Sequence, residues 1–118
     1  MSESNYESTM AYGADQYRDV LDRLNHDGLP AEFIQTGGMN AAIMVTLEAG
    51  HHLLVTDQED ALAWDRSGHR GWYVGLYPAD EGEQPIRWLE ANDGSASMLF
   101  TMIDRLLRTD DKRVRPLG

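Results

Sequence analysis

The strongest constraint on the fold is a regular alternation of side chains that begins at Ala41. From Ala41 to Leu47 every second residue is aliphatic, and side chains two apart share one face of a β-strand. A turn that contains Gly50 follows, where a positive φ costs a glycine little. His52–Thr56 is then short and apolar enough to pair back as an antiparallel partner. The stretch predicts a β-hairpin at the centre of the fold.

A second hairpin is predicted directly after the first one. Ala61–Trp64 and Trp72–Tyr77 have the composition of strands, and the polar segment Asp65–Arg70 would form the tip between them. In such a hairpin Trp64 and Trp72 would lie opposite each other, and a cross-strand aromatic pair contributes roughly 0.2–1 kcal/mol. Together the two hairpins predict a four-stranded antiparallel meander.

Segments on either side of these hairpins extend the predicted architecture. Ala31–Gln35 is a short extended segment, and Pro85–Leu89 is predicted as an edge strand, where a proline is tolerated. A first helix is expected from about Asp15 to Gly28, and a closing helix from about Asp93 or Ser95 to Arg108, on the basis of capping residues and apolar spacing. The expected buried stripes are Tyr17, Val20, Leu21 and Leu24 in the first helix and Leu99, Met102, Ile103 and Leu106 in the second.

These elements predict an α+β fold, an antiparallel meander of four to six strands flanked by an N-terminal and a C-terminal helix. Both helices are most simply placed on one face of the sheet. A chain of 118 residues is the size of one domain. We expect the domain to span residues 14–109, with a mobile tail at 1–13 and a charged tail at 110–118.

The composition excludes several classes of protein. The chain has no cysteine, which excludes disulfides and thiolate chemistry. No apolar run approaches the ~20 residues that span a bilayer, and the first residues are acidic and polar, unlike a signal peptide. We therefore expect a cytoplasmic protein that does not contact a membrane.

The charge is unevenly distributed along the chain. The net charge is −10, and the run Leu24–Asp65 contains seven carboxylates and no lysine or arginine. Direct nucleic-acid binding is disfavoured, because phosphate contacts need clustered cations and the chain has one lysine, Lys112. The acidic run is either a solvated surface or a surface for a basic partner.

The residues that could carry catalysis or hold a metal lie in unfavourable patterns. His51 and His52 are adjacent, so on a regular strand they point to opposite faces and cannot share one ion. His69, Asp65 and Ser67 are too close in sequence to form a nucleophile, base and orienting group within a shaped pocket. We expect no metal site, no cofactor and no catalytic residue.

The residues expected to bind a partner combine acidic and aromatic side chains. Carboxylates between two strands can be presented together by a loop, and tryptophan and tyrosine are typical of interface hot spots. The predicted partner-binding residues are Asp57, Glu59, Asp60, Trp64, Asp65, Tyr73 and Tyr77.

Part of the chain resembles a known group of proteins. The segments concerned are Gln35–Ile43, His52–Asp57, Trp64–Arg66 and Gly71–Tyr77, within roughly residues 30–78. They are similar to small uncharacterised proteins encoded by actinobacteria and their phages. The resemblance implies a phage or accessory context and no activity or site residue.

Three classes of function follow from these observations. The leading hypothesis is a non-enzymatic, small acidic binding protein, of phage or accessory type, that acts on a host protein through an acidic sheet edge. The second is a small ligand-binding protein or enzyme with an aromatic pocket between the sheet and the helices. The third is a self-associating structural domain, for which a homodimer is the expected assembly.

Overall fold

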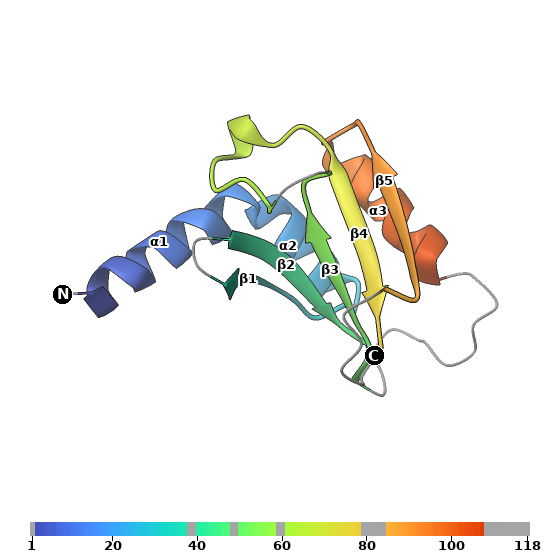
Figure 1. Ribbon diagram of the computed structural model, residues 1–118, viewed down its shortest axis with the longest axis horizontal. Coiled ribbons are helices and arrows are strands. Elements are labelled where there is room, and N and C mark those ends of the chain that lie inside the picture. Colours follow the sequence, from blue (N-terminus) through green and yellow to red (C-terminus); the bar gives the residue numbers. More distant parts are fainter. Residues whose placement is uncertain (1, 38–39, 48–49, 59–60, 79–84, 108–118) are drawn as a thin grey trace.

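The computed structural model describes residues 2–37, 40–47, 50–58, 61–78 and 85–107. Two helices precede an antiparallel sheet and a third helix follows it (Figure 1). The helices are α1 (Ser2–Gln16), α2 (Arg18–His26) and α3 (Ala96–Leu107). The strands are β1 (Ala31–Gly37), β2 (Asn40–Thr46), β3 (His52–Thr56), β4 (Trp72–Tyr77) and β5 (Arg87–Ala91), with a short 3₁₀ turn at Arg66–Gly68 before β4.

The sheet is a simple meander, in which each strand pairs antiparallel with the next strand in sequence, in the order β1-β2-β3-β4-β5. The α+β prediction is therefore confirmed, with five strands. One continuous row of paired residues crosses the whole sheet, Phe33, Ile43, Val55, Val74 and Leu89. Neighbours along a strand point to opposite faces of the sheet. Counting every second residue along each strand from this row therefore gives all the residues on the same face.

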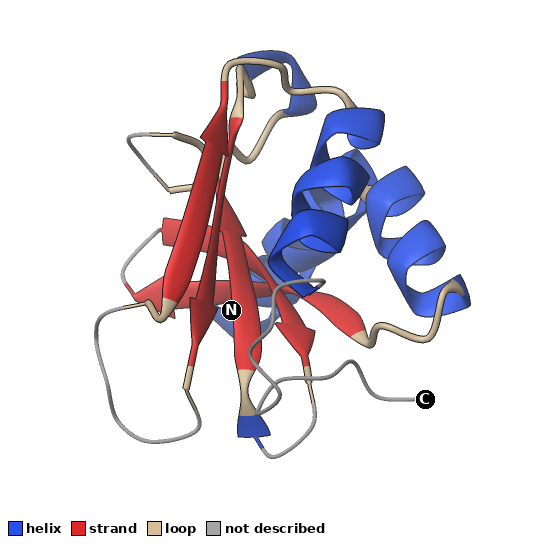
Figure 2. Cartoon of the chain, turned by 90° about the vertical axis from the view of Figure 1, so that its right-hand side faces the viewer, coloured by secondary structure: helices blue, strands red, loops and turns tan. Residues whose placement is uncertain are grey.

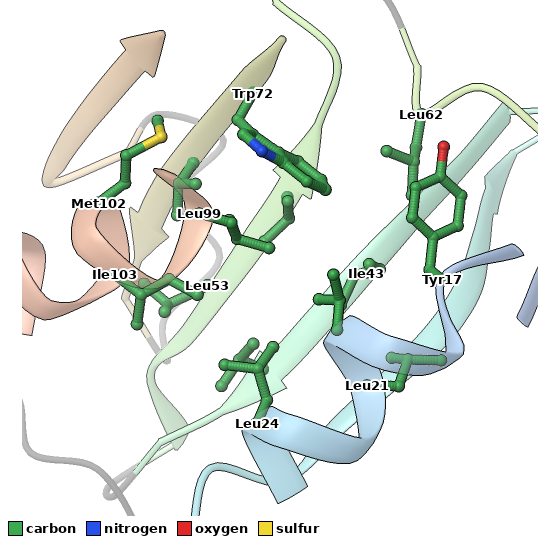
Figure 3. Packing of buried hydrophobic residues seen from close by; sticks show 14 of the residues in the cluster. Tyr17, Leu21, Leu24, Ile43, Leu53, Leu62, Trp72, Leu99, Met102 and Ile103 are labelled. Carbon is green, nitrogen blue, oxygen red and sulfur yellow. The ribbon is translucent and has the colours of Figure 1, made fainter. Parts of the chain in front are cut away.

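We call that side the inner face, because helices α2 and α3 both lie against it (Figure 2). Tyr17, just before α2, and the predicted stripes of α2 and α3 are all buried against it (Figure 3). The largest side chain of the core is Trp72, whose indole N–H donates to the carbonyl of Ser95 at 2.8 Å. Gly50 has a φ of 82°, as expected for the turn between β2 and β3.

The prediction of a second hairpin is wrong. β4 pairs with β3 and β5, and the described part of the segment between β3 and β4 makes one backbone bridge to the sheet, between Leu62 and Ala41. The apolar residues of β3 match those of β4 across their full length, so the short 61–64 segment is displaced from the sheet. Trp64 and Trp72 consequently do not face each other.

The N-terminal segment also differs from its prediction. Residues 1–13 were expected to form a tail, yet α1 begins at Ser2 and is followed by α2 after a break at Tyr17. Among the α1 side chains that the structure describes, Met10 and Ala14 pack against the core, and Gly13 lies against the ring of Phe33. The predicted charged tail at 110–118 lies outside the described residues.

Candidate protein-interaction surface

Asp57 organises the connection between β3 and β4, and it is less exposed than expected for a carboxylate on a loop surface, whereas its role in partner binding stays a prediction. Its side chain is 13% exposed. Its Oδ2 accepts the N–H of Ala63 at 2.9 Å, and its Oδ1 accepts the N–H of Arg70 at 3.1 Å. One carboxylate therefore joins the two ends of the connection. Glu59 and Asp60, which were expected to act with it, lie outside the described residues.

His69 belongs to the same connection, and its side chain is buried. Its side chain is 1% exposed, and Nδ1 lies 2.8 Å from Oδ1 of Asp57, within ion-pair distance but not in hydrogen-bonding geometry. The ring packs against Trp72 at a centroid distance of 3.9 Å, and against Tyr17 at 5.8 Å. An imidazole enclosed in this way anchors the loop and is not presented to a substrate in solution.

The other polar residues of this region do not gather around His69. Asp65 is exposed and accepts a hydrogen bond from the hydroxyl of Tyr12, and Ser67 is exposed in the 3₁₀ turn. Arg66 forms an ion pair with Asp19 of α2, with Nη1 2.8 Å from Oδ1, and this bond lowers the pKa of Asp19. The set of Asp65, Ser67 and His69 is thus not assembled as a catalytic group.

The histidines are also spread over the fold. His52 stacks on Tyr77 at one end of β4, with ring centroids 5.5 Å apart, whereas His69 packs on Trp72 at the other end. Among the described residues, no three side chains of the metal-ligating types lie close enough together to hold an ion.

Trp64 packs inside the fold and not on the surface predicted for it. It is partly buried, and its ring contacts that of Phe33 on the inner face, at a centroid distance of 5.3 Å. Tyr73 and Tyr77, in contrast, point away from the helices, on the opposite face of β4 from Trp72 and Val74. The predicted aromatic residues are therefore divided between the two faces.

The outer face, opposite the helices, is mostly apolar and aromatic. Its central row follows directly from the strand register and consists of Glu32, Met44, Leu54, Gly75 and Trp88. A neighbouring row contains Ile34, Ala42, Thr56, Tyr73 and Glu90. No helix among the described residues covers this face (Figure 2).

Trp88 is the most prominent side chain of the outer face. It is 53% exposed, and its ring stacks on Tyr73 with centroids 5.8 Å apart and planes inclined by 16°. Burial, together with Tyr77 and Glu90 nearby, raises the pKa of Tyr73. The alternation along β5 places Trp88 and Glu90 on one face of the strand and Leu89 on the other. Trp88 was nevertheless not among the predicted partner-binding residues.

Two cavities lie beside the described elements, and Glu90 of the outer face is among the residues that line the first of them. One of about 670 Å³ opens between the β3–β4 connection and the end of β5, and its lining includes Trp64, Arg70 and Asn92. Another of about 390 Å³ lies between α2 and α3, where Leu24, Phe100 and Ile103 line it. Buried core side chains, among them Tyr17, Trp72 and Leu99, lie between the sheet and the helices, where an aromatic pocket was expected (Figure 3).

Comparisons with protein-family models, with curated proteins and with solved structures give no match for this chain. None of the helices that the structure describes combines the length and the apolar character needed to cross a bilayer. Function is therefore inferred from the outer face and its charges.

Proposed function

We propose that this chain is a non-enzymatic binding protein that contacts a protein partner with a basic surface through the outer face of its sheet. The observation that carries the proposal is Trp88, which is 53% exposed although it is stacked on Tyr73. A large aromatic side chain held in place by a neighbour loses little conformational freedom when a partner covers it.

The surroundings of Trp88 support a contact surface and not a scattered exposed residue. Met44 and Leu54 continue its row across the sheet, and the ring of Tyr77 lies over Gly75, between Leu54 and Trp88. Interface hot spots are enriched in tryptophan and tyrosine, and near-neutral neighbours around them exclude water. An apolar strip with an aromatic pair at one end fits that pattern.

The charges on the outer face indicate which partner would be attracted. Its charged side chains, among the described residues, are Glu32 in β1 and Glu90 in β5, and no lysine or arginine lies between them. The whole chain carries a net charge of −10. Opposite charge on the partner would steer the encounter, and salt would weaken that steering. A basic surface on a host protein is the corresponding partner for a phage or accessory protein.

The test is capture of a partner from a host lysate, followed by measurement of binding rates with purified variants. Trp88→Ala should raise the dissociation rate about 30-fold, because hot-spot truncations cost ~2 kcal/mol or more. The matched control is Tyr12→Ala, since Tyr12 is 48% exposed but lies on α1, away from the outer face. It should leave the binding rates unchanged.

The acidic residues require a separate measurement. The double variant Glu32→Gln and Glu90→Gln should lower the association rate and flatten its dependence on salt. Asp22→Asn, an exposed carboxylate on α2, is the control and should have little effect. Binding that responds to Tyr12→Ala and not to Trp88→Ala would contradict the proposal. Sedimentation that shows a stable dimer, lost in Trp88→Ala, would instead favour the self-association hypothesis.

A further inference from the structure

The two edges of the sheet differ in how their backbone groups are occupied. At the β1 edge, the side chain of Asn25 binds both groups of Ala31: its amide donates to the carbonyl at 3.0 Å, and its oxygen accepts the N–H at 3.1 Å. At the β5 edge, no side chain in the described part of the chain bonds to the backbone of Arg87–Ala91, which pairs with β4 on one side only. Within the described residues β5 is the last strand of the sheet and pairs with no strand on its far side, which we call the open edge (Figure 1).

The register shows which residues of β5 face that edge. In a strand, the N–H and C=O of one residue point to the same side, and the side alternates from residue to residue. Ala31, on the inner face, directs both groups away from β2, so the outer-face residues of β1 are the ones that pair with β2. The bond from the Leu62 N–H to the carbonyl of Ala41, an inner-face residue of β2, agrees with this alternation.

Carried through the four pairings, the alternation directs inner-face residues of β4 and β5 toward each other, at Val74 and Leu89 for example. Trp88 and Glu90 therefore direct their N–H and C=O groups to the open edge, while their side chains lie on the outer face. The residues that dominate the proposed contact surface thus also offer main-chain hydrogen bonds. Backbone groups in this arrangement are a template for an added strand.

We propose that the partner contributes an extended basic segment that adds to the sheet as a sixth strand, antiparallel to β5. This inference rests on the proposed function and names the contact that the partner makes. The segment would place an apolar side chain opposite Trp88 and, two residues earlier in its own sequence, an arginine or lysine opposite Glu90. Opposed side chains in an antiparallel pair have Cβ atoms ~4.5–5.5 Å apart, close enough for an ion pair with Glu90.

A second copy of the chain fits this edge less well. Antiparallel pairing of β5 with itself about Leu89 would put the Glu90 side chains of the two copies on the same face, as diagonal neighbours, with no cation between them. Each copy also carries a net charge of −10, which opposes association. Charge complementarity therefore favours a basic segment as the occupant.

The experiment uses the full chain and a synthetic probe, acetyl-Thr-Arg-Thr-Val-Thr-Val-amide, followed by amide hydrogen exchange. In the free protein, the amides of Trp88 and Glu90 should exchange faster than that of Leu89, which bonds to β4. At saturating probe, exchange at Trp88 and Glu90 should slow at least tenfold, with little change at Leu89. Replacing the arginine of the probe with glutamine should weaken binding to the native chain but not to Glu90→Gln.

N-methylation of the probe supplies a matched pair. A methyl group on the nitrogen of the first valine, which faces β5, should abolish the protection, whereas one on the following threonine, which faces away, should not. Equal effects of the two methyl groups, or no protection at Trp88 and Glu90 at millimolar probe, would overturn strand addition. The proposed function would fail separately, through a captured partner that is insensitive to Trp88→Ala. Protection of β5 that rises with the concentration of the chain alone would identify the occupant as a second copy and overturn the basic segment.

Discussion

Replacing Asp57 with alanine should destabilise the protein by an amount set by the groups that the carboxylate holds. The substitution removes the acceptor of the Ala63 N–H, which is partly buried, and that of the Arg70 N–H, which is exposed and can bond to water. A hydrogen bond to a charged group contributes ~1.5–3 kcal/mol, and an unpaired buried donor costs ~1–3 kcal/mol. The buried ring of His69 also loses its neighbouring carboxylate. We expect a total loss of about 2–4 kcal/mol.

The assay is chemical and thermal unfolding of Asp57→Ala beside two other variants. For a chain of this length, each kcal/mol corresponds to ~3–5 °C, so the melting temperature should fall by roughly 6–20 °C. Asp57→Asn should be intermediate, because the amide keeps one acceptor but turns its NH₂ group toward a backbone donor. Asp22→Ala, at an exposed position, should stay within about 0.5 kcal/mol of the native chain. A midpoint for Asp57→Ala that matches Asp22→Ala would refute the role assigned to Asp57.

Three further predictions concern the core and the titratable groups. Ile103→Ala should cost ~2–5 kcal/mol, because Ile103 is 2% exposed in the core, and urea unfolding measures the loss. Burial raises the pKa of Tyr17 above its usual value of 10.0. The unfolded chain therefore loses that proton at a lower pH than the folded chain, and the free energy of unfolding should fall as the pH rises above about 10. In Tyr17→Phe the fall should be less steep, and urea midpoints at neutral and alkaline pH measure the difference. Zinc or nickel at neutral pH should not raise the melting temperature, since His52 and His69 lie at opposite ends of β4; a rise that is lost in His52→Ala would contradict this.

Periodicity along the sequence was sufficient for the elements that pack against each other. The stripe at Leu99, Met102, Ile103 and Leu106 is buried as predicted, and the alternation from Ala41 to Leu47 lies in a strand of the predicted first hairpin. These patterns are reliable because a helix or strand with one apolar face has to bury it. The start of α1 was missed, because its first residues carry no such face.

Strand pairing and side-chain direction in the connection could not be predicted in the same way. Ala61–Trp64 has a strand-like composition, but whether it pairs depends on competition with β4 for β3, which involves residues distant in sequence. In the sequence, Asp57 cannot be distinguished from an exposed loop carboxylate. Its structural role depends on the positions of the N–H groups of Ala63 and Arg70, which only the folded chain brings to it. Trp88 was assigned to an edge strand, but its exposure follows only from knowing which face the helices cover.

The most direct test of the central claim is hydroxyl-radical footprinting of the chain with and without its captured partner. If the outer face is the contact surface, the partner should protect Trp88, Tyr73 and Met44 from oxidation, because all three lie on that face. Tyr12 on α1 and Phe100 on α3 should react equally in both samples. Protection of Tyr12 or Phe100, with Trp88 as reactive in the complex as in the free chain, would contradict the assignment of the outer face.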